Sequence, residues 1–525
     1  MNTTNNGTLP ALLSLQAERN PRDVFVIFER QSGSVEGPAV EQQWSYGSFD
    51  RQVNQTCRFL QELGISQGEV VNLHLPNCPA FLLLWFALAR LGAVMMPTNV
   101  LASASEMEYL LTHSGSVYAF SVKSCENTLS GISNLPDSLR QVIYCDDPER
   151  GFETRIAGYS DAAFEIELQP GDLAAIMYTS GTTSRPKGVM VTHANYIRAG
   201  TTVAQTINLQ RNDRHYVVLP LFHGNAQYYS VMSALVCGAS VALMDRFSAS
   251  RYFDRCVYHH CTVASLFAAP MRMILAQPEK PEDRDNDLRG IIFAQSLTAE
   301  QLDDWDRRFG APLGQLWGMT ETMGPPLMNR WDTKPRNQTI GMPVGGYDVR
   351  IVNSNGRQVA AGETGEIVVR GVPGETIMLG YFKNQQATDS TIRDGWLYTG
   401  DNAYQDPDGY FVFVDRVKDM IKRSGENVSA GEVESVIQQH PAVFECAVVG
   451  LPDEMRDEKI VAVVVLKPEQ KLDAETLITY CRKHLASFRV PQEVVFQATM
   501  PKTSVGKIMK HVIKHNLLSK ASTLS

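Results

Sequence analysis

Through its first two-thirds, the chain alternates segments of helical periodicity with short runs of β-branched and other apolar residues. Residues 49–63 are predicted to form an amphipathic helix with Ser48 as its N-cap, and residues 69–75 a strand. A helix over 80–91 and a strand over 94–97 repeat the pattern. Such alternation predicts parallel sheets covered by helices, as in α/β proteins.

Two further strands are predicted over 216–221 and 240–244, and each leads into a loop at its carboxyl end. Ligands of open α/β sheets bind outside those carboxyl ends, so we expect the functional site there. The longest apolar run, residues 80–96, contains Arg90 and Gly92. We therefore predict a buried helix followed by a strand, rather than a membrane span.

Chain length and a change in the sequence pattern predict more than one domain. The 525 residues exceed a typical domain of about 150 residues several-fold. Near residue 345, short strands separated by Gly-, Asn- and Asp-rich turns predict a small β-rich subdomain. After Arg416 the pattern becomes α+β. We predict an N-terminal domain of residues 1–416, built from stacked α/β sheets and this subdomain, and a small, mobile α+β domain of residues 417–525.

Charge and cysteine usage exclude several functional classes. A formal net charge of −9 argues against sequence-independent nucleic-acid binding, which requires excess basic charge. The nine cysteines include no C-x-x-C pair, so a zinc site or a disulfide framework is not expected. The first ten residues lack the features of a secretory signal. We predict a cytoplasmic protein without stable membrane insertion, whose oligomeric state the sequence leaves open.

The most informative segment is Tyr178-Thr-Ser-Gly-Thr-Thr-Ser-Arg-Pro-Lys187-Gly188, which follows an apolar strand over 173–177. Its glycines permit tight curvature, so that backbone amides can point into one concavity. Hydroxyl groups and one lysine add further donors. The segment therefore predicts a polyphosphate-binding loop ahead of a helix that begins near His193. It is not a Walker A loop, because the order is Lys-Gly.

This loop and four later motifs resemble, in order, those of the adenylate-forming superfamily, which includes acyl-CoA synthetases, firefly luciferase and peptide-synthetase adenylation domains. The later motifs are Trp317-Gly-Met-Thr-Glu321, Tyr398-Thr-Gly-Asp401, Asp415-Arg416-Val-Lys418-Asp419 with the loop to Asn427, and Pro501-Lys-Thr-Ser-Val-Gly-Lys507. The resemblance covers residues 44–510. It implies that a carboxylate attacks the α-phosphate of ATP, giving an acyl-adenylate and pyrophosphate.

The resemblance also implies roles for individual residues. Glu321 is expected to bind Mg²⁺, which prefers carboxylate, water and phosphate oxygens, and Thr320 to donate to the α-phosphate. Lys507 is expected to stabilise charge on the reacting groups, with Lys418 as the hinge of the small domain. The residues expected to contact ATP are Thr179, Ser180, Gly181, Thr182, Thr183, Lys187, Ala294, Gln295, Ser296, Trp317, Gly318, Met319, Asp401 and Arg416.

The acyl site is expected beside His223, which follows Pro-Leu-Phe in the sequence and fits the family's gating position. Apolar residues 266–270 and 294–297 are expected to line it. The run Ala294-Gln-Ser-Leu297 departs from the Gly-Gly-Ala-Pro-like run common in relatives, which puts the shape of the pocket in question.

Coenzyme A is the expected acyl acceptor, with Gly425, Phe488 and Arg489 as its contacts. The motifs look most similar to those of the bacterial carnitine/crotonobetaine–CoA ligase group. A quaternary ammonium would require an aromatic box or an acidic partner; Tyr228, Tyr229 and Phe267 could supply the former, whereas Asn225 stands where an acid is expected. A short, medium-chain or aryl acid stays open. The alternatives are a stand-alone enzyme that loads a carrier protein, and a non-catalytic nucleotide-binding protein.

Overall fold

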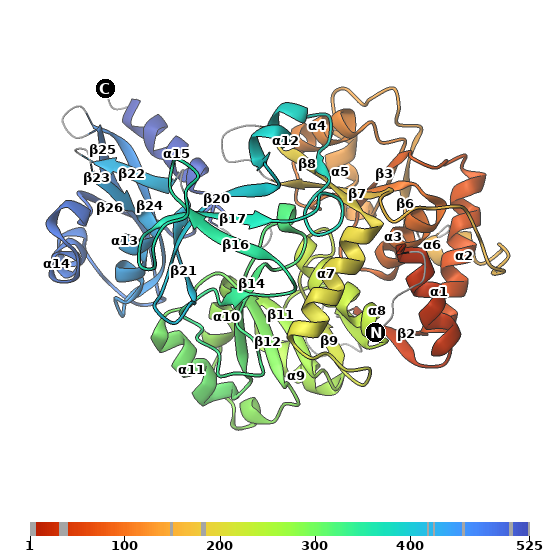
Figure 1. The fold of residues 1–525 in the computed structure, drawn as a ribbon, viewed down its shortest axis with the longest axis horizontal. Helices are drawn as coiled ribbons and strands as arrows, with labels where there is room; N and C mark the ends of the chain where they lie inside the picture. Colours follow the sequence, from red (N-terminus) through yellow and green to blue (C-terminus); the bar gives the residue numbers. More distant parts are fainter. Residues whose placement is uncertain are drawn as a thin grey trace.

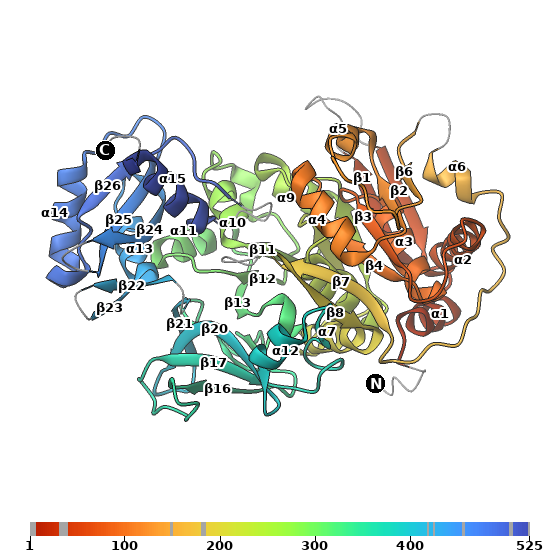
Figure 2. The same cartoon turned by 90° about the horizontal axis from the view of Figure 1, so that it is seen from above.

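The computed structural model describes residues 7–30, 40–147, 151–179, 185–416, 419–423, 426–453, 457–502 and 508–522. Figure 1 shows a mixed α/β chain, as the sequence predicts. Two large sheets with their helices form most of the molecule, and a smaller antiparallel sheet adjoins them. In Figure 2, residues beyond about 420 form a separate α+β body at one end of the molecule.

The larger of the two main sheets is parallel from β1 to β13 and antiparallel at both edges. Its strands, in spatial order, are β15 (Met342–Pro343), β14 (Leu327–Met328), β13 (Leu313–Trp317), β12 (Gly290–Ala294), β11 (Val263–Phe267), β9 (Arg214–Val217), β10 (Ser240–Met244), β1 (Val24–Arg30) and β2 (Val40–Ser45).

The second main sheet contains a parallel core and an antiparallel hairpin of β7 and β8. Its strands, in spatial order, are β18 (Gly380–Tyr381), β8 (Lys187–Thr192), β7 (Leu173–Thr179), β4 (Val94–Pro97), β3 (Val70–His74), β5 (Tyr118–Ser121) and β6 (Gln141–Tyr144).

Two smaller sheets come later along the chain. The first comprises β16 (Asp348–Val352), β17 (Gly365–Arg370), β20 (Trp396–Gln405), β19 (Ile392–Arg393) and β21 (Phe411–Arg416). The second comprises β23 (Glu426–Ser429), β22 (Met420–Arg423), β25 (Asp457–Leu466), β24 (Val443–Asp453) and β26 (Glu493–Phe496). The predicted domain boundary falls on residues 417 and 418, which lie outside the described residues.

Helices pack on the faces of the sheets. Those of the first 416 residues are α1 (Leu9–Arg19), α2 (Tyr46–Glu62), α3 (Pro79–Leu91), α4 (Ala104–Ser114), α5 (Glu126–Ser130), α6 (Phe152–Ile156), α7 (His193–Thr206), the π-helix η2 (Asn225–Val231), α8 (Met232–Cys237), α9 (Tyr252–Tyr258), α10 (Ala268–Leu275), α11 (Ala299–Phe309) and α12 (Gln385–Thr391). The last three helices are α13 (Ala430–Gln438), α14 (Ala474–His484) and α15 (Lys510–Ser522).

The main core lies between the two large sheets, and helices fill it. Every one of the 13 residues of α3 is buried, which explains why this segment is apolar all round. The predicted helix over 80–91 and strand over 94–97 are therefore confirmed. None of the helices in the described part of the chain is long and apolar enough to cross a membrane.

Three local expectations were wrong. Ser45, not Ser48, caps α2: its side chain accepts from the Ser48 amide, and Ser48 completes a capping box at the third helical position. The strand predicted over 216–221 ends at Val217, because the Asn77 side chain bonds the backbone at Leu219 and Leu221 instead. Residues 187–192 form β8, a strand missed between the phosphate loop and α7.

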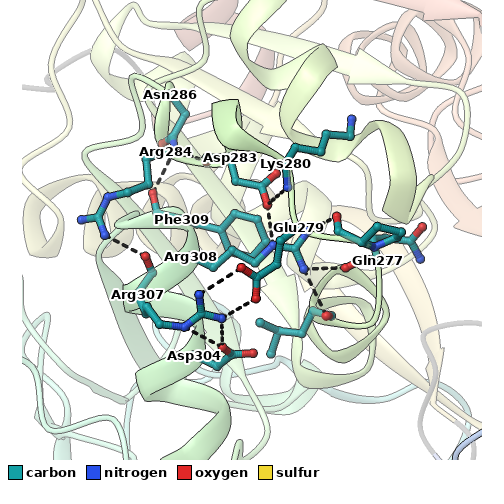
Figure 3. Close-up of polar contacts among 12 residues, drawn as sticks. Gln277, Glu279, Lys280, Asp283, Arg284, Asn286, Asp304, Arg307, Arg308 and Phe309 are labelled. Carbon is teal, nitrogen blue, oxygen red and sulfur yellow. Dashed lines mark hydrogen bonds and ion pairs between the residues drawn. The ribbon is translucent and has the colours of Figure 1, made fainter.

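An ion-pair cluster fixes α11, the helix that leads into β13. Figure 3 shows that Arg307 forms ion pairs with Glu279 and Asp304, and that Arg308 forms one with Asp283. Arg308 also donates to the carbonyls of Leu275, Gln277 and Pro278. Because four of the five N–H groups of the buried guanidinium donate to these acceptors, the cluster fixes the position of α11.

Candidate functional site

Three of the predicted nucleotide-binding residues meet where β13 ends against the smaller antiparallel sheet. The indole nitrogen of Trp317 donates to Asp401 Oδ2 over 2.9 Å, and Arg416 Nε lies 3.1 Å from Asp401 Oδ1. Asp401 comes from β20 and Arg416 from its neighbour β21, where they are paired in register. The carboxylate is therefore held between an indole and a guanidinium, both supplied by strand ends.

A second carboxylate lies in the turn after β13. Glu321 is buried, and its Oε1 accepts from the Tyr381 hydroxyl over 2.8 Å. The ammonium group of Lys187 lies 4.6 Å from the centroid of the same tyrosine ring. Burial raises the pKa of the Glu321 carboxyl, whereas the hydrogen bond from Tyr381 and the charges of Arg416 and Lys187 lower it.

The hairpin of β7 and β8 carries the predicted phosphate loop. Thr179 ends β7 and is paired with Lys187, the first residue of β8. Ser180, Gly181, Thr182 and Thr183 lie outside the described residues. Gly188 lies in β8 rather than in the turn, which corrects the expectation that it supplies curvature: a Cβ there would lie 2.6 Å from Ile176 Cγ2, so close packing requires glycine.

The segment after β12 shows how this chain accommodates its departure from the family's glycine-rich run. Ala294 ends the strand, and Gln295 comes next with a φ of 73°, a region that favours glycine. Arg272 of α10 donates to the carbonyl of the next residue, Ser296, over 3.4 Å. Gln295 thus adopts a backbone conformation that favours glycine. The hydrogen bond from Arg272 anchors the loop, which tolerates this strain.

The remaining predicted residues of the first 416 lie around these groups. Gly318, Met319 and Thr320 are half-buried in the turn that leads to Glu321. His223 is half-buried in the loop after β9, its ring centroid 5.0 Å from that of Phe222. Gly318 is close-packed, since a Cβ there would lie 2.8 Å from the hydroxyl of Tyr229.

Of the C-terminal residues, Lys418, Gly425 and Lys507 lie outside the described residues. Phe488 and Arg489 have partners in their own domain: Arg489 forms an ion pair with Glu432, and the Phe488 carbonyl accepts from Arg423. Their roles as contacts of coenzyme A stay predictions.

Sequence reasoning missed Tyr381 and Arg272. Tyr381 lies on the two-residue strand β18, paired with β8, and reaches Glu321 across 60 residues of sequence. Arg272 contacts the Ser296 loop, and burial lowers its pKa while Glu445 of the C-terminal domain opposes that shift. Neither residue belongs to a recognisable motif, so only the folded chain identifies them.

Within the described part of the chain, no three His, Cys, Asp or Glu side chains gather as a metal site. A single buried carboxylate, Glu321, is instead the group that suits an ion held mostly by phosphate and water oxygens. All nine cysteines are free thiols.

Comparison with known proteins agrees with this geometry. Residues 13–382 match the AMP-binding enzyme family, and residues 432–507 match the AMP-binding enzyme C-terminal domain. A crotonobetaine/carnitine–CoA ligase of Salmonella enteritidis PT4 is 36% identical over 498 residues, which cover 93% of this chain and 95% of the relative.

Solved structures of acyl-CoA ligases share the fold. ATP-bound MatB from Rhodopseudomonas palustris aligns with a TM-score of 0.87 at 25% identity, covering 97% of this chain and 99% of that one. Apo MatB aligns with the same coverage and identity but a TM-score of 0.75. A benzoate CoA ligase from Burkholderia xenovorans LB400 aligns with a TM-score of 0.85 at 26% identity, covering 97% of this chain and 99% of that one. The chain therefore belongs to the AMP-binding enzyme family, among the AMP-forming acyl-CoA ligases.

Proposed function

We propose that this protein activates a small carboxylic acid with ATP and transfers the acyl group to coenzyme A. The observation that carries the proposal is the meeting of Trp317, Asp401 and Arg416 next to the turn bearing Glu321. A ribose can donate its hydroxyls to the Asp401 carboxylate, and the indole offers a face for adenine. Arg416 then faces the ribose–phosphate region as a fixed cation.

The two half-reactions would use these groups in sequence. An oxygen of the acid bonds to the α-phosphorus while the bond to the pyrophosphate oxygen breaks. The thiol of coenzyme A then bonds to the carbonyl carbon, and AMP leaves. Both reactants of the first step are anions, so Lys187, Thr320 and Lys507 would offset charge and hold them in line.

Glu321 would bind Mg²⁺ together with phosphate oxygens and water. The metal would supply charge neutralisation on the phosphates. Tyr381 supports this role because its hydroxyl bonds one carboxylate oxygen, which orients the group and favours its ionised form. The Lys187 ammonium over the Tyr381 ring belongs to the same cluster.

The acid is proposed to enter beside His223, and coenzyme A to meet the Gly425 loop with Phe488 and Arg489. Because a similar protein is a crotonobetaine/carnitine–CoA ligase, carnitine-like acids are the first candidates to assay. We further propose a reducing compartment such as the cytoplasm, which the nine free thiols support.

Acid-dependent pyrophosphate exchange and chromatography of CoA products over a panel of acids test the function. We expect AMP, pyrophosphate and a CoA thioester with at least one acid. Exchange without any CoA thioester would indicate an enzyme that loads a carrier protein. Absence of AMP with every acid, despite ATP binding by calorimetry, would indicate a non-catalytic nucleotide-binding protein.

A further inference from the structure

The π-helix η2 carries two buried polar side chains, and one of them has an amide nitrogen without a partner among the described residues. Asn225 and Tyr229 are four residues apart, about one turn, and are 7% and 6% exposed. π-Helical segments are rare and often occur at functional sites. A role for these two side chains in selecting the acid rests on the proposed ligase function.

Asn225 opens η2 directly after the His223 loop. Its Oδ1 accepts from the Ser265 hydroxyl of β11 over 2.8 Å, while its Nδ2 has no partner within the described structure. Ser265 is itself only 2% exposed. Whichever way the amide is turned, Ser265 uses one of its polar atoms and the other stays unpaired.

Tyr229 presents its hydroxyl at the other end of the helix. A Cβ on Gly318 would lie 2.8 Å from that oxygen, so the hydroxyl faces the turn between Trp317 and Glu321. Glycine at position 318 leaves the space beside the hydroxyl free of a side chain.

Two other polar side chains of the same helix, Gln227 and Tyr228, are satisfied. Gln227 donates to the Leu221 carbonyl over 2.6 Å and accepts from the Tyr196 hydroxyl over 2.5 Å. The Tyr228 hydroxyl donates to Met177 Sδ over 2.8 Å. The unpaired amide nitrogen of Asn225 is therefore not shared by these two neighbours. Asn225 and Tyr229 flank the path from the strand β11 to the nucleotide-binding turn.

This path is where an acyl chain must lie if its carboxylate is to meet the α-phosphate. The carboxyl ends of β11, β12 and β13 are neighbours in the parallel sheet, and ligands bind outside such ends. Ser265 and Phe267 are on β11, Ala294 ends β12, and Trp317 ends β13. Asn225 thus lies on the β11 side of the path, and Tyr229 on the β13 side.

We propose that Asn225 and Tyr229 recognise an uncharged hydrogen-bonding group on the acyl chain. The preferred acid is then a hydroxy or oxo acid rather than its unsubstituted counterpart. A hydroxyl or carbonyl can pair with an amide and a phenol. Two neutral groups cannot offset a buried charge, and a trimethylammonium group has no N–H to donate.

The expected discrimination is substantial. A site built to hydrogen-bond a substrate group rejects the analogue that lacks it, since its own polar atoms are then left unpaired. We expect kcat/KM to be about 10- to 100-fold higher for the preferred hydroxy or oxo acid than for the plain acid. Carnitine, which carries a hydroxyl, should exceed crotonobetaine, which does not.

The test compares butyrate with its 2-, 3- and 4-hydroxy and 2- and 3-oxo derivatives, and carnitine with crotonobetaine, by AMP release and CoA-thioester formation. Asn225→Leu and Tyr229→Phe should each reduce the hydroxy or oxo preference by about tenfold, because kcat/KM for the oxygenated acid should fall more than kcat/KM for butyrate. Tyr252→Phe is the matched control, because Tyr252 is a buried tyrosine whose hydroxyl has no partner among the described residues and which packs in another core cluster.

Equal kcat/KM for plain and oxygenated acids in the wild type would overturn the inference, as would a preference that neither variant reduces. If Asn225→Leu does not fold by circular dichroism, Tyr229→Phe, which removes one oxygen, decides alone. Absence of AMP with every acid would instead overturn the proposed function, and this inference with it. AMP formation without preference overturns only the inference.

Discussion

Glu321 is the side chain whose protonation state most affects the proposed chemistry, since only its carboxylate can bind Mg²⁺. Burial raises its pKa, and the hydrogen bond from Tyr381 opposes that shift. Tyr381→Phe removes the opposing bond, so the acid limb of the kcat/KM profile for Mg–ATP should move to higher pH. We expect the loss in kcat/KM to be largest at the acid end of the profile and to shrink as the pH rises, because bonds to charged groups are worth roughly 1.5–3 kcal/mol.

Tyr258→Phe is the control for this change, since Tyr258 is 58% exposed and ends α9, a helix outside the group around Glu321. Its profile should match that of the wild type. A Tyr381→Phe profile lowered equally at every pH would show that the tyrosine acts by packing and not through the Glu321 carboxyl.

For single residues, the sequence predicts those that lie within motifs and misses those that contact the motifs from other parts of the chain. Trp317 and Asp401 are predicted because each lies in a recognisable motif, and the structure places them in contact. Tyr381 and Arg272 are single residues whose contacts depend on tertiary folding, so their spacing carries no signal.

Among the elements, the β7–β8 hairpin matters most because Lys187 lies at its loop end, paired with Thr179. Gly188→Ala would place a Cβ 2.6 Å from Ile176 Cγ2 and 3.3 Å from Tyr178 Cζ. Such overpacking should lower the free energy of unfolding by about 1–3 kcal/mol. Because the neighbouring Lys187 would shift with the strand, kcat/KM for ATP should fall as well. Urea unfolding followed by fluorescence, together with kinetics, measures both effects.

Gly171→Ala provides the comparison, because Gly171 precedes β7 and has no heavy atom within 4 Å of an added Cβ. We expect it to change neither stability nor activity. Equal stability of the Gly188 and Gly171 variants would contradict the packing explanation for Gly188.

The elements that the sequence predicts best are those with a clear period or a long apolar run. Helix α3 is predicted by its composition, whereas β8 was missed because its six residues lie directly between a loop and a helix. Positions of caps are harder, as Ser45 and Ser48 are both serines and only the hydrogen bonds distinguish them. Pairing across the sheets cannot be read from local pattern.

Across the whole molecule, three buried histidines link stability to pH. Burial lowers the pKa of His74 and His193 to about 4 and that of His215 to about 3, from an ordinary value of 6.5. Among the described residues, each has one ring nitrogen without a partner. Below pH 6.5 the unfolded chain therefore binds more protons than the folded one, and stability falls with pH toward about 4. The loss is roughly 1.4 kcal/mol per pH unit for each histidine.

Urea unfolding at pH 7, 6 and 5 measures this dependence. His215→Gln should make the dependence of the free energy of unfolding on pH shallower, since the variant no longer takes up that proton on unfolding. His260→Gln should leave it unchanged, because the His260 side chain is 80% exposed. Equal slopes in both variants and the wild type would show that burial of His215 does not contribute.

The position of the C-terminal domain relative to the first 416 residues bears on how one site could serve both adenylation and thioester formation. The TM-score of this chain is higher with ATP-bound MatB, at 0.87, than with apo MatB, at 0.75. Contacts bridge the chain on both sides of residues 417–418: Asp415 Oδ2 accepts from the Gly431 amide over 2.9 Å and from the Ser429 hydroxyl over 3.1 Å. Glu445 of the C-terminal domain lies near Arg272 of α10. These contacts join the two parts of the chain in this structure.

Adenylation is expected to need Lys507 beside the α-phosphate, and thioester formation to need it withdrawn so that the thiol can reach the carbonyl. Lys507→Ala should abolish adenylation yet spare thioester formation from a supplied acyl-adenylate. Lys418→Pro, which fixes φ near about −65°, should do the reverse if it locks the adenylating pose. Equal loss of both half-reactions in both variants would refute two alternating poses. Near-wild-type activity of Lys418→Pro would leave Lys418 as a surface charge in a linker.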